Sequence, residues 1–113
     1  MDCLFCKIIE KKIPAKIEFE DPDFLAFHDI NPQAPIHVLI IPKRPILRIA
    51  ETSKEDALLL GKLLLTATEV ARRLGLEQKG YRLVINNGPD GGEAVPHLHI
   101  HLLGGRSMNW PPG

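Results

Sequence analysis

The chain has 113 residues and carries 14 acidic and 14 basic side chains, so its formal net charge is zero. This length suits one domain with a real hydrophobic core. No lysine or arginine stripe marks a nucleic-acid surface, and no apolar run approaches the roughly 20 residues of a membrane span. With two cysteines and no signal-peptide pattern, we expect a cytoplasmic protein without a structural disulfide.

The first predicted element is a short helix over residues 4–12, because apolar residues recur at helical spacing and Pro14 follows. Cys3 and Cys6 flank its start. They form either half of a zinc site, since thiolates at this spacing suit tetrahedral coordination, or two half-buried thiols without a metal. The second interpretation is preferred.

Residues 16–20 and 24–28 alternate around the turn Asp21-Pro22-Asp23, which predicts a β-hairpin. The polar loop of residues 29–35 follows. Asp29 beside Ile30 at a strand end is either a plain turn or a grip for ribose hydroxyls and the adjoining base.

Residues 37–42 form a continuous apolar run that predicts a central strand. His37 at its start is either an exposed polar end or a support for other histidines.

Thr52 and Glu55 have the spacing of a capping box, which predicts a long helix ending near Leu74 with Gly75 just beyond it. Its apolar residues cover more than one narrow stripe. The helix therefore packs on the sheet alone or also meets a partner subunit, and core packing alone is preferred.

Residues 81–86 predict a further strand, and residues 87–92 have the composition of turns. Gly91 and Gly92 either bring backbone N–H groups to an anion or merely close a long hairpin. Residues 104–113 form a proline-rich tail that holds the only tryptophan, Trp110.

Three histidines distinguish residues 95–103, where His97, His99 and His101 alternate with aliphatic residues. In a strand this alternation places all three imidazoles on one face and the aliphatic side chains on the other. Imidazoles titrate near neutral pH, so the cluster predicts catalysis by a nucleophile with an acid and an orienting group, or metal binding. Three histidines at this spacing are improbable as structural residues alone.

The pattern His-x-His-x-His-x-x resembles the histidine-triad (HIT) superfamily, and the ending from Leu103-Gly104-Gly105-Arg106 to Trp110-Pro111-Pro112-Gly113 is similar to its Hint branch. The resemblance covers nearly all of residues 1–113 as one HIT domain. It implies an α+β fold with a five-stranded antiparallel sheet, one long helix and one short helix. It further implies a homodimer whose two sheets join into ten strands.

The resemblance also implies a purine nucleoside phosphoramidate hydrolase that works through a covalent histidyl-nucleotide, without a metal or other cofactor. His99 would be the nucleophile, His101 would contact the phosphate and leaving group, and His97 and His37 would support them. Asn86 and the backbone of Val95 would hold phosphate oxygens, and Asp29 would bind the ribose. The base and sugar pocket would be lined by Phe5, Ile8, Ile13, Phe27, His28 and Ile30, and Trp110 would reach the partner subunit's site.

The sequence departs from these relatives at two positions. Ala94 stands where relatives in this branch carry a serine that contacts the phosphate, so that contact is missing. Zinc-binding relatives add a histidine after Pro-Lys-x, where this chain has Pro45, and structural zinc needs four ligands. Two rival functions remain: a metal enzyme that uses the three triad histidines as ligands, and a nucleotide-binding module with slow or vestigial hydrolysis.

Overall fold

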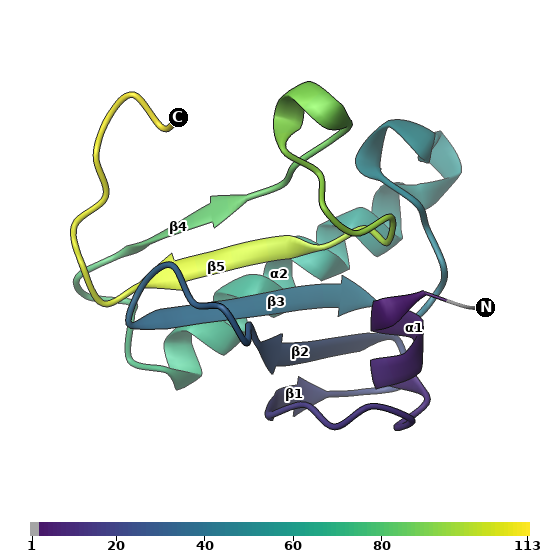
Figure 1. Cartoon of the computed structure of the whole chain (residues 1–113), viewed down its shortest axis with the longest axis horizontal. Helices are drawn as coiled ribbons and strands as arrows, with labels where there is room; N and C mark the ends of the chain where they lie inside the picture. The colour runs from purple at the N-terminus through teal and green to yellow at the C-terminus, as the bar shows by residue number, and fades with distance from the viewer. Residues whose placement is uncertain (1–2) are drawn as a thin grey trace.

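The computed structural model of the protein describes residues 3–113 and contains two helices and five strands (Figure 1). Three short 3-10 turns lie at Ile49–Glu51, Lys54–Asp56 and Pro89–Gly91. The helices and strands are α1 (Leu4–Ile9), β1 (Ile17–Glu20), β2 (Phe24–His28), β3 (Ile36–Pro42), α2 (Ala57–Arg73), β4 (Tyr81–Val84) and β5 (Ile100–Gly104).

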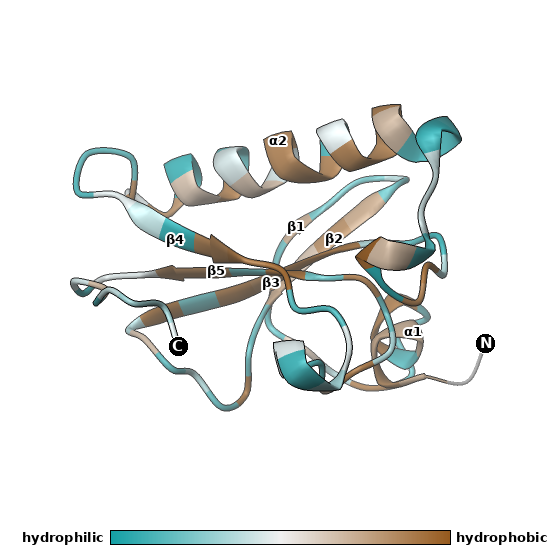
Figure 2. Ribbon diagram, turned by 90° about the horizontal axis from the view of Figure 1, so that it is seen from above, coloured by the Kyte–Doolittle hydropathy of each residue, from teal (hydrophilic) through white to brown (hydrophobic). Residues whose placement is uncertain are grey.

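The strands form one antiparallel sheet in the order β1-β2-β3-β5-β4. α2 covers one face, and α1 lies on the other side of the sheet, as Figure 2 shows. The predicted α+β fold, with its antiparallel five-stranded sheet, one long helix and one short helix, is therefore confirmed. The joining of two sheets into ten strands stays a prediction.

Two apolar clusters hold the sheet between the helices. The larger packs α2 residues such as Leu63, Ala67 and Val70 against one face of the sheet. The smaller packs Phe5 and Ile8 of α1 on the opposite face, over the apolar residues Leu25, Phe27, Leu39 and Ile41. Because β3 is buried on both faces, its continuous apolar run is explained by its central position, as predicted.

α2 buries only part of its apolar surface. Its exposed leucines are Leu58 at 71%, Leu64 at 46% and Leu65 at 68%. The preference for core packing alone is therefore wrong for these three side chains, which the sheet does not cover.

Several predicted element boundaries are wrong. α1 ends at Ile9, and Lys11, with φ of 62°, turns the chain before Pro14 is reached. Ser53, not Thr52, caps the turn before α2: its backbone N–H donates to the Asp56 carboxylate over 2.9 Å. The strand predicted to reach Asn86 ends at Val84.

The cysteine prediction is also wrong, because Cys3 and Cys6 form a disulfide across the first turn of α1. Within residues 3–113, no helix combines the length and the apolar character needed to cross a membrane.

Candidate functional site

The three triad histidines lie on the face of the sheet opposite α2. Regular pairing in β5 starts only at Ile100, so of the three only His101 belongs to a strand. The alternation nevertheless extends upstream, because Leu98, Ile100 and Leu102 are all buried in the cluster under α2. The predicted separation of imidazoles from aliphatic side chains is thus found, although the strand is shorter than expected.

His99 has its tautomer set by the backbone. Its Nδ1 lies 2.6 Å from the carbonyl oxygen of His97, and a carbonyl can only accept, so Nδ1 carries the proton. In the neutral ring the lone pair is therefore on Nε2. The Phe5 ring meets His99 edge-on at 5.1 Å between centroids, and His99 is buried. These contacts fix the ring of the predicted nucleophile.

His37 and His101 form a second oriented pair. The backbone N–H of Gln33 donates to Nδ1 of His37 over 3.0 Å, which leaves the His37 proton on Nε2. This Nε2–H donates to Nδ1 of His101 over 2.9 Å. His101 in its neutral form then carries its own proton on Nε2. One loop N–H therefore fixes the tautomers of two imidazoles, and His37 is buried and bonded to His101 rather than an exposed strand end.

The His37–His101 pair is held in its neutral form. Burial, together with the nearby charges of His99 and His37, lowers the pKa of His101 to about 4, against an opposing effect of Asp29. Burial also lowers the pKa of His37, again opposed by Asp29, whose carboxylate oxygen lies 3.5 Å from His37 Nε2. At neutral pH His101 is thus a hydrogen-bond donor and not a cation.

This burial makes stability depend on pH. The depressed pKa of His101 means that the unfolded chain takes up its proton first, between its ordinary pKa of 6.5 and about 4. Stability is therefore lost as pH falls through this window, and we expect a loss of about 1–2 kcal/mol from His101 between pH 7 and pH 5. Urea unfolding at both pH values measures it. His101→Asn should show a smaller loss, and an equal loss in both proteins would contradict the assignment.

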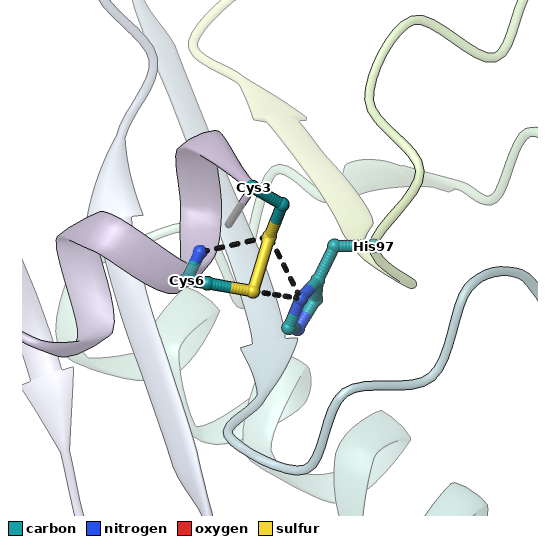
Figure 3. A group of neighbouring side chains, drawn as sticks. All are labelled: Cys3, Cys6 and His97. Atoms are coloured by element: carbon teal, nitrogen blue, oxygen red, sulfur yellow. Dashed lines mark hydrogen bonds between the residues drawn. A yellow bond between two sulfur atoms is a disulfide. The ribbon is translucent and has the colours of Figure 1, made fainter. Parts of the chain in front are cut away.

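His97 is the most buried of the three, with 1% of its surface exposed. Its Nε2 donates to the carbonyl oxygen of Pro42 over 2.8 Å, and burial lowers its pKa. Its Nδ1 lies 3.7 Å from Cys3 Sγ and 3.6 Å from Cys6 Sγ, as Figure 3 shows. His97 thus supports His99 through its carbonyl group, not through its ring.

A cavity of about 190 Å³ lies beside α1. All six predicted pocket residues line it, and so do Asp29 and Val95. Ile30 lines the rim with 98% of its surface exposed, so nothing in this protomer packs over it. His28 Nε2 forms a hydrogen bond with Glu18 Oε1 over 2.8 Å. Asp29 accepts from the Asn31 N–H over 2.8 Å, which makes the loop a turn and leaves the other carboxylate oxygen toward His37.

Of the two predicted phosphate residues, Asn86 lies just beyond the end of β4, whereas Val95 lines the cavity beside α1. Val84, the last residue of β4, pairs with His101, and Asn86 follows two residues later. Glu93 stabilises the loop that follows Asn86. Its carboxylate accepts hydrogen bonds from Arg48 Nε at 2.9 Å and from the Gly88 N–H at 2.9 Å. Arg48 and the Gly88 N–H lower the pKa of Glu93. No local sequence pattern signals this contact, because Arg48 and Glu93 are 45 residues apart.

Trp110 is not docked against the rest of the described chain, since 82% of its surface is exposed. The tail is held by Arg82, which donates to the Asn109 carbonyl over 2.8 Å, and by Arg106, which donates to the Gln33 carbonyl. The tail therefore starts at the end of β5 and reaches the edge strand β4 at Asn109. Contact with a partner's site stays a prediction.

The structure gives little support for metal binding. Among the described residues, no potential ligand group contains all three triad histidines. The rings of His97 and His99 donate to backbone carbonyls, and the ring of His101 accepts from His37. Cys3, Cys6 and His97 do cluster, but they are three donors where a structural zinc needs four. Beside Cys6, the position of the fourth ligand in zinc-binding relatives holds Pro45, which has no donor. The residues do not fit a structural zinc.

Comparison with known proteins agrees with this geometry. The family model of the HIT domain matches residues 10–108. An uncharacterized HIT-like protein of Synechococcus elongatus is 57% identical over 112 residues, which cover 99% of this chain and 97% of that protein. A HIT family hydrolase from Legionella pneumophila is 53% identical with a TM-score of 0.97, covering 99% of this chain and 100% of that one. A HIT family hydrolase from Clostridium thermocellum is 47% identical with a TM-score of 0.92, covering 96% and 94%.

The match of the family model over most of the chain, the two hydrolases of the same fold and the three oriented histidines lead to one conclusion: the chain belongs to the HIT family.

Proposed function

We propose that the protein is a hydrolase of purine nucleoside phosphoramidates, such as adenosine monophosphate joined to an amine. Two similar proteins of known structure are named HIT family hydrolases. The observation that carries the proposal is the tautomer of His99: with its proton held on Nδ1 by the His97 carbonyl, Nε2 offers a lone pair. Phe5, which lines the cavity beside α1, packs against the same ring.

In the first step, Nε2 of His99 attacks the phosphorus and the bond from phosphorus to the amine nitrogen breaks. The histidyl-nucleotide gains positive charge on its ring, which the short Nδ1–H bond to the His97 carbonyl stabilises. The ionised Glu93 interacts electrostatically with His99 and favours the same charge.

His101 acts in this step as a neutral donor. Its Nδ1 is occupied by His37, so only its Nε2–H is available for the phosphate. Such a donor stabilises charge on a phosphoryl oxygen in the transition state. A neutral His101 cannot supply a proton without becoming an anion, so the reacting substrate is the form whose phosphoramidate nitrogen has taken up one further proton from solvent, and the amine leaves neutral with that proton.

In the second step, water attacks the phosphorus of the histidyl-nucleotide. The bond between phosphorus and Nε2 breaks, the nucleoside monophosphate leaves, and the water proton passes to solvent. His99 returns as the same neutral tautomer because Nδ1 has kept its proton throughout. Two easier displacements thus replace one difficult displacement.

Turnover of a fluorogenic adenosine phosphoramidate, beside a panel of other phosphoramidates and dinucleoside polyphosphates, tests this function. Hydrolysis at the P–N bond with multiple turnovers supports it. Tight binding of adenosine monophosphate without turnover of any phosphoramidate would instead favour the nucleotide-binding module.

We further propose a homodimer formed at the β4 edge of the sheet. β4 is a terminal strand of the sheet, and the tail that carries the exposed Trp110 is tied to it by Arg82. Large aromatic side chains are favoured as interface anchors. Trp110 would then lie beside the partner subunit's site, near the leaving amine.

Truncation after Arg106 tests the role of the tail. This cut keeps the Arg106 contact with the Gln33 loop, which orients His37. We expect changed discrimination among leaving amines, measured as the ratios of kcat/KM across an amine series, while the dimer persists and adenosine monophosphate binding changes little. Unchanged ratios in the truncated dimer would count against a role for Trp110.

A further inference from the structure

A pair of cysteines lies directly against the triad. Cys3 and Cys6 form a disulfide, and both sulfur atoms lie within 3.7 Å of Nδ1 of His97 (Figure 3). The proposed hydrolysis uses neither cysteine, and their donor set does not fit a structural zinc.

We propose that Cys3 and Cys6 are a thiol–disulfide exchange site whose redox state controls the support of His97 and, through it, the orientation of His99. The effect on catalysis rests on the proposed function; the exchange itself does not.

The two sulfur atoms have different surroundings. Cys3 is the N-cap residue of α1 and is half-buried, and its Sγ accepts the Cys6 N–H over 3.0 Å. This N–H would stabilise negative charge on the Cys3 sulfur in the reduced form. Cys6 is only 7% exposed and borders a cavity of about 180 Å³ that Lys43 and Pro45 also line. Cys3 is therefore the attacking sulfur and Cys6 the resolving one.

The exchange partner is a disulfide of a small thiol or of a dithiol protein. The Cys3 thiolate attacks one sulfur of that disulfide, and the other sulfur leaves as a thiol. The Cys6 thiolate then attacks the Cys3 sulfur and releases the second thiol. Two electrons pass from the cysteine pair to the partner, and the two cysteine protons end on the two released thiols. A dithiol reductant reverses the reaction.

His97 links this exchange to the triad. Its Nε2–H is bound to the Pro42 carbonyl, so in the neutral ring Nδ1 offers a lone pair to the sulfur atoms. A Cys6 thiol can donate its S–H to this lone pair, whereas a disulfide has no proton to donate. Reduction therefore adds a bond that anchors His97. The His97 carbonyl accepts the hydrogen bond from Nδ1 of His99 over 2.6 Å. A change in the position of His97 therefore changes the orientation of His99.

The first test needs no substrate. The protein is equilibrated with reduced or with oxidised glutathione, and alkylated thiols are counted by mass spectrometry. We expect both cysteines to be alkylated after reduction and neither after oxidation. The ¹⁵N resonances of the His97 ring should shift between the two forms. Retention of one zinc per reduced chain after desalting, or a His97 resonance that does not move, overturns the proposal.

Two cysteine variants test whether the redox state changes the rate of catalysis. Since one hydrogen bond is gained, reduced protein should turn over the adenosine phosphoramidate roughly 2- to 10-fold faster than oxidised protein. Cys3→Ser keeps a capping oxygen and the Cys6 thiol, so it should match reduced wild type in both buffers. Cys6→Ala lacks the donor and should match oxidised wild type in both.

The outcomes separate the two proposals. A redox response that persists in Cys3→Ser, or equal rates for reduced and oxidised wild type, overturns the control of His99. If no form turns over the phosphoramidate, the proposed function fails, and the thiol count with the His97 resonances still decides the exchange site. Thermal unfolding of each variant identifies any rate change that follows from loss of the fold.

Discussion

Replacement of His99 by alanine is expected to lower phosphoramidate turnover by roughly a thousandfold or more, because it removes the nucleophile. In the wild type, an acid-sensitive adenylylated protein should accumulate when substrate is mixed and quenched rapidly. Its added mass should map to the peptide that contains His99. The variant should show no such adduct.

Two controls make the result specific. Adenosine monophosphate should still bind to His99→Ala, because the cavity beside α1 is lined by other side chains. His101→Ala should retain the adduct and form it slowly, since His101 donates to the phosphate without forming a bond to it. Near-normal turnover in His99→Ala, or an adduct on another residue, would refute the assignment of His99.

The sequence predicted the faces of the triad segment well, and the reason is local. Leu98, Ile100 and Leu102 must be buried, and an extended chain then turns the intervening histidines to the other face. These features depend on burial at a period of two residues, which a sequence displays directly.

The orienting contacts of the site were not predictable in this way. The Gln33 N–H meets His37 only because the loop of residues 29–35 adopts one particular turn. Cys3 meets His97 across 94 positions of the chain, through the packing of α1 on the sheet. Neither contact follows from composition or periodicity, and the Cys3–Cys6 disulfide contradicted the expectation drawn from the inferred compartment.

The pocket residues could be predicted from the family resemblance but not from periodicity. Their identities came from the resemblance to the HIT superfamily, and the structure gathers all six around one cavity. Their apolar character alone would have assigned Phe5, Ile8 and Phe27 to the core, which they also help to form. A residue that both packs and lines a ligand cavity cannot be recognised as a binding residue from burial.

Asp29 gives the second large expected effect. Its Oδ1 caps the turn at Asn31, and its Oδ2 lies toward His37 at the cavity rim. If the carboxylate also accepts hydrogen bonds from both ribose hydroxyls, Asp29→Ala should weaken binding of adenosine monophosphate by about 1.5–3 kcal/mol. Isothermal titration against the ribonucleotide and its 2′,3′-dideoxy analogue measures the two affinities.

The matched control is Asp29→Asn, which keeps an oxygen for the Asn31 N–H and removes the charge. Since charge-assisted bonds are the stronger kind, Asp29→Asn should lose part of the ribonucleotide affinity while the turn is preserved. In both variants the dideoxy analogue should lose much less, because it has no hydroxyls to donate. Equal losses for the two ligands would show that Asp29 acts on the loop and on His37 and does not read the sugar.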